Sequence, residues 1–347
     1  MNLAFVESPV QLLNVLEWTH TRGGHADTTV VVLPPVDPMS RGQLRRMAEL
    51  ARDEGMAVRW QEARGETGAP LKALRALTGL IRRADRIVIG DPFSRYVQLL
   101  LSLVRTRRIT VVDDGTATME FVAQLARGER LVRWHRRGSR GPRELLLAPV
   151  TSAARRSFTP SATRTVEVFT AMPVQAPQGV EVTSNTFAWT RDRFGPPLIT
   201  KGADLVGTSL VETGVVDPVP YQEAVTALAR THGATRYFAH RRESAEKLHA
   251  LEAATGLEIV RPDLPLELIA RRGPIGHTVL SFPSTVVHTL PLALAGTGVK
   301  VAVCDIAPEW LRDSASPRAH GFLSGVTETA RDVQRLAPWR ATAVAEG

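Results

Sequence analysis

The stretch Ile109-Thr110-Val111-Val112-Asp113-Asp114-Gly115 ends an apolar run on two acidic residues and a glycine. Its first four residues are all β-branched and predict a buried strand, and a helical pattern begins just beyond the glycine. Adjacent carboxylates there are unfavourable for stability, because burial desolvates them and their like charges raise at least one pKa. In α/β proteins the carboxyl end of a strand is also where ligands bind. The acidic pair is therefore the first place to look for a catalytic base, with a turn or a cap of the following helix as the alternative.

Strand and helix patterns alternate through the first part of the chain. Short apolar runs are separated by segments with apolar residues at helical spacing. Such alternation predicts a parallel sheet with helices on both faces. The predicted strands are 3–6, 29–33, 58–61, 86–89 and 109–112, and the predicted helices are 10–21, 43–54, 71–83, 95–105 and 116–126.

This pattern is lost over residues 127–161, where arginines are crowded together with glycine and proline. We interpret this segment as a solvated helix end and loop, with contact to an acidic acceptor or a membrane surface as the alternative. The proline- and threonine-rich residues 172–197 are predicted to link two domains. The arginines of the crowded segment are Arg127, Arg130, Arg133, Arg136, Arg137, Arg140 and Arg143.

Alternation resumes near Asp204 and predicts a second α/β domain. Its predicted strands are 205–210, 235–239, 258–260, 277–282 and 300–304, and its helices are 221–231, 244–255, 264–270 and 286–295. We expect an N-terminal domain at 1–190, a C-terminal domain at 200–330, and a helix near 330–336 within a tail, 331–347, that packs back on the first domain. Two doubly wound Rossmann-like domains facing a central cleft form the GT-B plan, which two-domain binding proteins and some epimerases share.

Composition limits the kinds of partner. The 347 residues carry a net charge of +8, mostly from arginine, which suits nucleotide phosphates, acidic glycans, lipid headgroups or nucleic acid, or reflects only GC-rich codon usage. Aromatic residues are only 5% of the chain, so nucleic acid is not the expected partner. Cys304 is the only cysteine, which rules out an intramolecular disulfide. Without a recognisable signal peptide or spanning segment, we expect a cytoplasmic protein, with peripheral contact at the inner face of the membrane as a further option.

Three groups of polar residues follow predicted strands of the second domain. His240 and Arg241 end the strand at 235–239 and suit phosphate binding, or form a surface turn. Ser284 and Thr285 precede an apolar helix, where they could hold an anion or simply cap the helix. Glu267 could accept the hydroxyls of a ribose, or lie exposed on a short amphipathic helix.

Taken in order, these motifs resemble those of the bacterial GT-B sialyltransferases and polysialyltransferases. That family has an acidic-acidic-glycine motif in its first domain, and a His-Pro and a Ser-Ser/Thr motif in its second. The corresponding residues here are Asp113-Asp114-Gly115, His240-Arg241 and Ser284-Thr285, so Arg241 stands where the family has proline. The opening Ser8-Pro9-Val10-Gln11-Leu12 also resembles the Ser-Pro-x-Gln-Leu start of several members.

The resemblance implies an inverting, metal-independent transfer of sialic acid or a related nonulosonic acid. The donor would be a CMP-sugar, the acceptor a hydroxyl of a glycan or another small molecule, and no separate cofactor is implied. Asp113 would be the general base for that hydroxyl, with Asp114 as the second candidate and Gly115 completing the motif. Positioning and phosphate stabilisation would matter most, because the donor loses CMP readily.

Roles in the second domain follow from the same resemblance. His240 would bind the CMP phosphate and assist its departure, with Arg241 as an additional cation. Ser284 and Thr285 would hold the same phosphate, and Glu267 would bind the cytidine ribose. The residues expected to face the cleft near the transferred sugar are Ser8, Pro9 and Gln11.

Two other functions fit the sequence. A GT-B transferase could use another donor, such as CMP-Kdo or a UDP- or TDP-sugar, because the motifs define the phosphate and the base better than the sugar. A basic protein that binds glycan or nucleic acid without catalysis is the alternative from another class.

Overall fold

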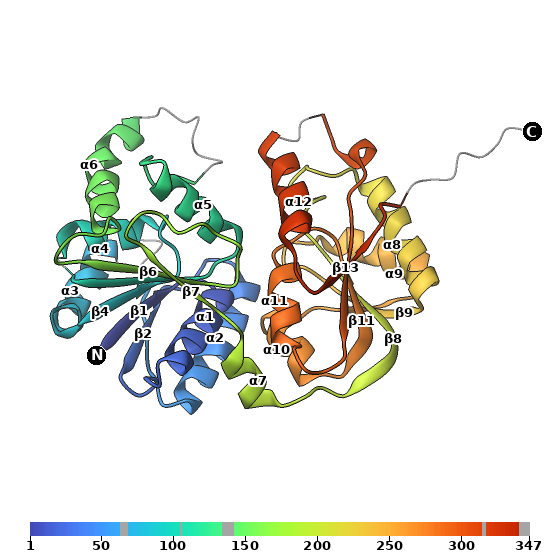
Figure 1. Ribbon diagram of the computed structural model, residues 1–347, viewed down its shortest axis with the longest axis horizontal. Coiled ribbons are helices and arrows are strands. Elements are labelled where there is room, and N and C mark those ends of the chain that lie inside the picture. The colour runs from blue at the N-terminus through green and yellow to red at the C-terminus, as the bar shows by residue number, and fades with distance from the viewer. Residues whose placement is uncertain (63–68, 105, 134–141, 314–316, 340–347) are drawn as a thin grey trace, which may run out of the picture. The chain divides into compact units, whose positions relative to one another are not determined.

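The computed structural model describes residues 1–62, 69–104, 106–133, 142–313 and 317–339. The chain divides into two compact units, Met1–Trp189 (unit 1) and Thr190–Gly347 (unit 2). Each unit is built on one sheet of parallel strands, with helices on both faces of the sheet (Figure 1). The predicted fold class, α/β with two doubly wound Rossmann-like units, is confirmed.

In unit 1 the strand order is β3-β2-β1-β4-β5-β6-β7, so the direction of winding reverses between β1 and β4. Ligands of open α/β sheets bind at the carboxyl ends of the strands near such a reversal. The strands are β1 (Asn2–Val6), β2 (Thr28–Val32), β3 (Ala57–Trp60), β4 (Arg86–Ile89), β5 (Arg108–Val112), β6 (Thr165–Thr170) and β7 (Glu181–Ser184). The helices are α1 (Pro9–Thr21), α2 (Pro38–Asp53), α3 (Ala69–Arg83), α4 (Arg95–Leu103), α5 (Thr116–Ala126) and α6 (Pro142–Ser157).

In unit 2 the strand order is β10-β9-β8-β11-β12-β13, with β8 at the centre between β9 and β11. The strands are β8 (Ile199–Val206), β9 (Ala234–Phe238), β10 (Glu258–Val260), β11 (Ile275–Ser281), β12 (Lys300–Cys304) and β13 (Val333–Leu336). The helices are α8 (Pro218–His232), α9 (Ala245–Thr255), α10 (Leu266–Arg272), α11 (Val286–Ala293) and α12 (Pro317–Thr329), while α7 (Ala188–Phe194) spans the boundary between the units. No helix in the described part of the chain has the length and apolar character needed to cross a membrane.

Local sequence explains why these elements form where they do. Strand β2 is a run of threonine and valine that is buried along its whole length, as expected for a central parallel strand. Helix α1 begins at Pro9, and the Ser8 hydroxyl accepts the Gln11 N–H at 3.3 Å as its N-cap. This cap holds the loop that leaves β1.

Part of unit 1 was not predicted. The segment read as a solvated loop contains α6, and the predicted linker contains β7 and α7. Strand β6 was not predicted either. The sequence patterns of these strands are weak, because β6 carries the charged Glu167 in its middle and β7 is a short edge strand that is exposed at both ends. Arg136, Arg137 and Arg140 lie outside the described residues.

The helix predicted near 330–336 is wrong. Residues Val333–Leu336 form β13, which pairs in parallel with β12, and the last helix, α12, ends before it. Trp339 then packs near Trp310, with ring centroids 6.4 Å apart. Residues Val333–Leu336 of the tail therefore complete the sheet of unit 2 and are not helical. Residues 340–347 lie outside the described part.

Glu167 organises a buried polar cluster in the sheet of unit 1. Its side chain is 3% exposed and binds Arg22 at 2.6 Å and Arg86 at 2.8 Å. The hydroxyls of Thr110 and Thr183 donate to the same carboxylate at 2.8 and 3.0 Å. Burial raises the pKa of Glu167, but these hydrogen bonds and charges outweigh burial, so the pKa is lowered overall. The carboxylate therefore ties β4, β5, β6 and β7 together.

We expect Glu167→Ala to lower the free energy of unfolding by about 3 kcal/mol, because it leaves the Arg86 charge partly buried without its carboxylate. Urea denaturation measures this change. Arg127→Gln is the matched control, since Arg127 pairs with Glu129 on the surface and its loss should cost less than about 0.5 kcal/mol. Equal effects of the two substitutions would contradict a structural role for the Glu167 cluster.

Candidate active site

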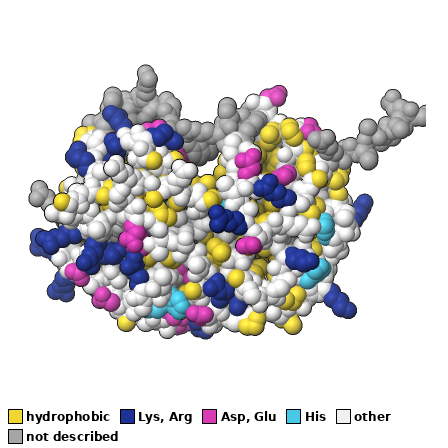
Figure 2. Space-filling model, in the orientation of Figure 1, with side chains coloured by type: hydrophobic (Ala, Val, Ile, Leu, Met, Phe, Trp, Pro, Cys, Tyr) yellow, Lys and Arg dark blue, Asp and Glu magenta, His cyan; other side chains and the backbone are white. Residues whose placement is uncertain are grey.

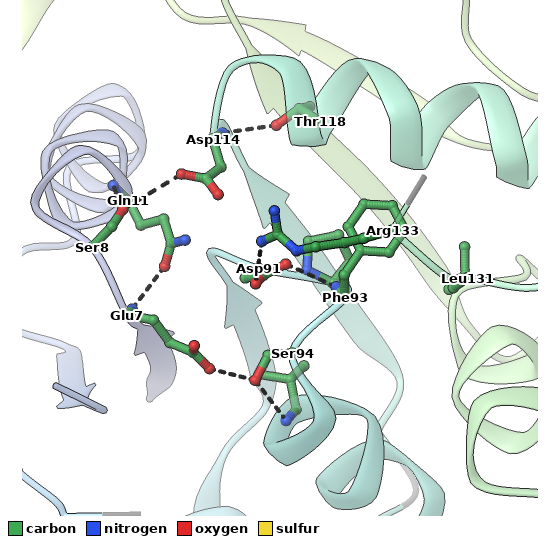
Figure 3. A network of polar contacts seen from close by, with 12 residues as sticks. Glu7, Ser8, Gln11, Asp91, Phe93, Ser94, Asp114, Thr118, Leu131 and Arg133 are labelled. Carbon is green, nitrogen blue, oxygen red and sulfur yellow. Dashed lines mark hydrogen bonds and ion pairs between the residues drawn. The ribbon is translucent and has the colours of Figure 1, made fainter. Parts of the chain in front are cut away.

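Polar side chains gather at the carboxyl edge of the unit 1 sheet, around the reversal between β1 and β4. Figure 3 shows this network, in which Glu7 and Ser8 follow β1, Asp91 follows β4 and Asp114 follows β5. Parallel strands bring these positions together, because all their carboxyl ends lie along one edge. The network is therefore where unit 1 is most suited to bind a ligand.

The loop after β1 is held firmly against this edge. The Glu7 N–H donates to Gln11 Oε1 at 2.7 Å, and Gln11 is buried. Gly90 lies so close to the Gln11 side chain that a Cβ at that position would collide with it. Ser8 Oγ lies 3.4 Å from Asp114 Oδ1 (Figure 3). Of the three residues predicted here, Ser8 touches the acidic pair, Gln11 supports the loop, and the buried Pro9 starts the helix.

Asp113 is turned into the protein. It is 2% exposed, its Oδ1 accepts the Gly115 N–H at 2.9 Å, and its Oδ2 accepts the Ala171 N–H at 3.1 Å. Burial raises the pKa of Asp113, although hydrogen bonds from Thr170, Ala171 and other neighbours oppose the rise. Both carboxylate oxygens are thus engaged by backbone donors from the ends of β5 and β6.

Asp114 is the more accessible member of the pair. It is half-buried, its N–H donates to Thr118 Oγ1 at 2.7 Å, and its carboxylate faces Ser8 across the edge of the sheet (Figure 3). Gly115 follows with φ of 62°, a conformation that favours glycine and lets the chain turn into α5. The Asp-Asp-Gly motif therefore combines a buried anchor, a more accessible carboxylate and a turn.

The network contains an ion pair, Arg133 with Asp91, that was not identified from the sequence. Arg133 Nη2 lies 2.6 Å from Asp91 Oδ2, and the guanidinium lies over the Phe93 ring at 5.7 Å from its centroid. Burial lowers the pKa of Arg133, but Asp91, Asp114 and Glu7 outweigh burial and raise it overall. Arg133 lies in the segment that the sequence predicts to be a solvated loop. Asp91 did carry a signal, because it stands directly after a strand and a glycine.

The second candidate region lies at the carboxyl edge of the unit 2 sheet. His240 follows β9, and the Arg242 N–H donates to its Nδ1 at 3.2 Å. A neutral ring that accepts at Nδ1 carries its proton on Nε2, which is then a donor. Burial, followed by the charges of Arg241 and Arg242, lowers the pKa of His240 to about 4. His240 is therefore neutral at physiological pH, and the exposed Arg241 adds a positive charge beside it.

Ser284 and Thr285 lie in the loop between β11 and α11, on the other side of β8 from His240. The Ser284 hydroxyl is buried and has no hydrogen-bond partner among the described residues. Thr285 is the residue before α11, and its side chain makes no capping hydrogen bond. Ordinary N-capping therefore does not account for either hydroxyl.

Glu267 lies inside unit 2 and not on an exposed helix face. It is 6% exposed, and the Thr289 hydroxyl donates to its Oε1 at 2.6 Å, which connects α10 to α11. This contact rules out the exposed position that was the alternative for Glu267. Its assignment to a ribose stays a prediction, as does the expectation that no metal is involved.

Comparisons with known proteins identify the fold. No protein-family profile and no curated protein sequence matches the chain. Among solved structures, a galactoside α-2,3-sialyltransferase from Photobacterium phosphoreum is similar, with 10% identity, a TM-score of 0.52 and coverage of 96% of this chain and 98% of that one. A putative UDP-N-acetylglucosamine 2-epimerase from Listeria monocytogenes has 12% identity, a TM-score of 0.50 and coverage of 88% and 78%.

At such low identities these likenesses show the fold alone. They agree with the strand orders of the two sheets in placing the chain among proteins built from two Rossmann-like units, the architecture of GT-B glycosyltransferases and of the epimerase. The likeness to the sialyltransferase and the likeness to the epimerase are almost equal in TM-score. The fold by itself therefore does not specify the reaction.

The lowered pKa of His240 predicts a loss of stability in acid. Between the ordinary value of 6.5 and the folded value of about 4, the unfolded chain binds a proton that the folded chain does not. Stability from this residue is therefore complete above pH 6.5 and falls as the pH drops toward 4. In His240→Asn, whose side-chain oxygen can still accept the Arg242 N–H, urea unfolding should lose this part of its pH dependence. Identical pH profiles for the two proteins would contradict a neutral, partly buried ring.

Proposed function

We propose that this chain is an inverting, metal-independent glycosyltransferase that moves sialic acid or a related nonulosonic acid from a CMP-sugar to a hydroxyl acceptor. The observation that carries the proposal is the chemistry that each unit presents at the carboxyl edge of its own sheet. The edge of unit 1 presents a half-buried carboxylate at Asp114, which can accept a proton. The edge of unit 2 presents donors at His240 and Ser284, which can bind a phosphate.

The base is Asp114 in this proposal, ahead of Asp113. Both oxygens of Asp113 accept backbone N–H groups within the protein, so that carboxylate has little capacity to meet a substrate. Asp114 is more exposed, the Ser8 hydroxyl lies 3.4 Å from its carboxylate, and the Arg133 charge interacts with it. The sequence motif names the pair, and the burial of each member supports this division of roles.

In the reaction, the acceptor oxygen attacks the anomeric carbon of the donor while the bond from that carbon to the CMP phosphate breaks. The hydroxyl proton passes to Asp114, which acts as general base. The electron pair of the broken bond remains on the phosphate, where His240 Nε2–H, the Ser284 and Thr285 hydroxyls and the Arg241 charge stabilise it. Attack opposite the leaving group inverts the anomeric configuration.

Support for CMP, as opposed to another nucleotide, comes from the ordered set of motifs. The phosphate site is compatible with any nucleotide sugar. The alternative donors are therefore CMP-Kdo and UDP- or TDP-sugars, and nucleotide binding distinguishes among the nucleotides. The net charge of +8 supports a peripheral position at the inner face of the membrane, close to acidic lipids.

We expect CMP to raise the melting temperature of the chain by several degrees at saturation, and more than UDP or GDP do. Differential scanning fluorimetry measures the shifts. Ser284→Ala is the informative variant, because a hydroxyl without a partner in the described structure should be lost without cost to the ligand-free protein. Its shift with CMP should shrink, whereas its melting temperature without ligand should not change. Equal shifts for all three nucleotides would count against a CMP-sugar donor.

Asp114→Asn is expected to reduce sugar transfer by at least about a hundredfold while CMP still binds and the fold is retained. Asp113→Asn should mainly reduce stability, because an amide nitrogen would face the N–H of either Gly115 or Ala171. Transfer to a panel of glycan acceptors, together with thermal melting, separates the two effects. Wild-type turnover in Asp114→Asn would assign the base elsewhere.

A further inference from the structure

The turn that carries His240 is closed by the carboxylate of Glu243. The Glu243 N–H donates to the His240 carbonyl at 2.9 Å, and the His240 N–H donates to Glu243 Oε2 at 2.6 Å. The two residues therefore bind each other reciprocally across the four-residue turn. Arg241 stands within this turn, at the position where the resembled motif has a rigid proline.

The other oxygen of Glu243 anchors the turn to the body of unit 2. Oε1 accepts the Tyr237 hydroxyl at 2.6 Å and lies 2.7 Å from Lys247 Nζ. Tyr237 belongs to β9 and Lys247 to α9, and the Tyr221 hydroxyl of α8 lies 2.8 Å from that of Tyr237. One carboxylate thus connects the His240 loop to a strand and two helices.

Space and charge around Glu243 leave it little freedom. It is 3% exposed, and a Cβ at Gly207 would collide with the Glu243 carboxylate and lie 2.6 Å from the Tyr237 hydroxyl. Lys247 compensates its charge, and Glu212 lies 3.4 Å from the same ammonium group. Apolar residues of similar volume could fill such a position at no greater cost, so stability alone does not call for a buried ion pair.

We propose that Glu243 is a positioning residue, which fixes the 240–243 turn so that His240 accepts at Nδ1 and directs an Nε2–H donor to its ligand. The role of that donor in binding phosphate rests on the proposed function, whereas the orientation of the ring does not. In this chain a buried carboxylate holds the loop that a proline would otherwise restrain.

Glu243→Gln tests the proposal with little change in shape. Both oxygens of Glu243 accept from donors, so an amide nitrogen would face either the His240 N–H or Tyr237 and Lys247. We expect the variant to fold but to hold the turn loosely. Glu243→Asp is the second variant, because its shorter carboxylate keeps the charge but cannot reach both sets of donors.

The direct readout is the imidazole ¹⁵N spectrum of the ligand-free full chain, in which His240→Asn identifies the His240 signals. In the wild-type protein we expect an unprotonated Nδ1 and a protonated Nε2, and in both Glu243 variants exchange-averaged shifts. CMP affinity, measured by calorimetry, should fall at least about tenfold in the variants. Glu212→Gln is the matched control, since it removes a neighbouring charge from Lys247 without touching the turn, and both readouts should stay at wild-type values.

The outcomes are distinguishable. Wild-type ¹⁵N shifts for His240 in a folded Glu243→Gln or Glu243→Asp variant would overturn the positioning role, whatever the protein binds. If the wild-type chain binds no CMP while the His240 signals still respond to Glu243, the proposed donor fails and the positioning role stands. Equal effects from Glu212→Gln would also overturn the proposal, because they would trace the change to general electrostatics.

Discussion

A buried carboxylate needs hydrogen-bond donors, and the Asp113 carboxylate obtains them from the chain itself. Its two oxygens accept N–H groups from Gly115 and Ala171, which lie just beyond the ends of β5 and β6. The Asn14 amide donates to the Asp113 carbonyl at 3.1 Å and so adds α1 to the same junction. Because these bonds fix the backbone at residue 113, the next side chain, Asp114, is held at the edge of the sheet.

Unit 2 meets the same requirement with Glu243. Its carboxylate also binds the backbone of a loop at the end of a strand. In our proposal it supports the neighbouring His240 and does not itself contact a substrate. The difference lies in the counter-charge: Asp113 depends on neutral donors, whereas Glu243 has Lys247 at 2.7 Å. In both units, a carboxylate that is engaged within the protein holds the backbone of the residue to which the proposal assigns chemistry.

Much of the architecture could be predicted because parallel sheets make strong local patterns. A run such as that of β2 is buried on both faces and is therefore apolar throughout. The elements that were missed are those in which tertiary contacts replace this pattern. Strand β6 accommodates Glu167 because Arg22 and Arg86 compensate its charge, and β13 is a short strand stabilised by pairing with β12. The partners of Glu167 and of β13 lie far from them in the sequence, so local periodicity could not reveal β6 or β13.

The sequence by itself determined the two α/β units and the placement of Asp113-Asp114, His240 and Ser284-Thr285 at strand ends, because hydrophobic periodicity and strand-end chemistry are local properties. Only the tertiary structure decided which carboxylate of the pair faces inward, that Arg133 and Asp91 join the edge of unit 1, and that Glu243 closes the His240 turn. These features depend on hydrogen bonds and burial between segments far apart in the chain. Adjacent residues such as Asp113 and Asp114 have nearly the same sequence context, and only their surroundings in the folded protein distinguish them.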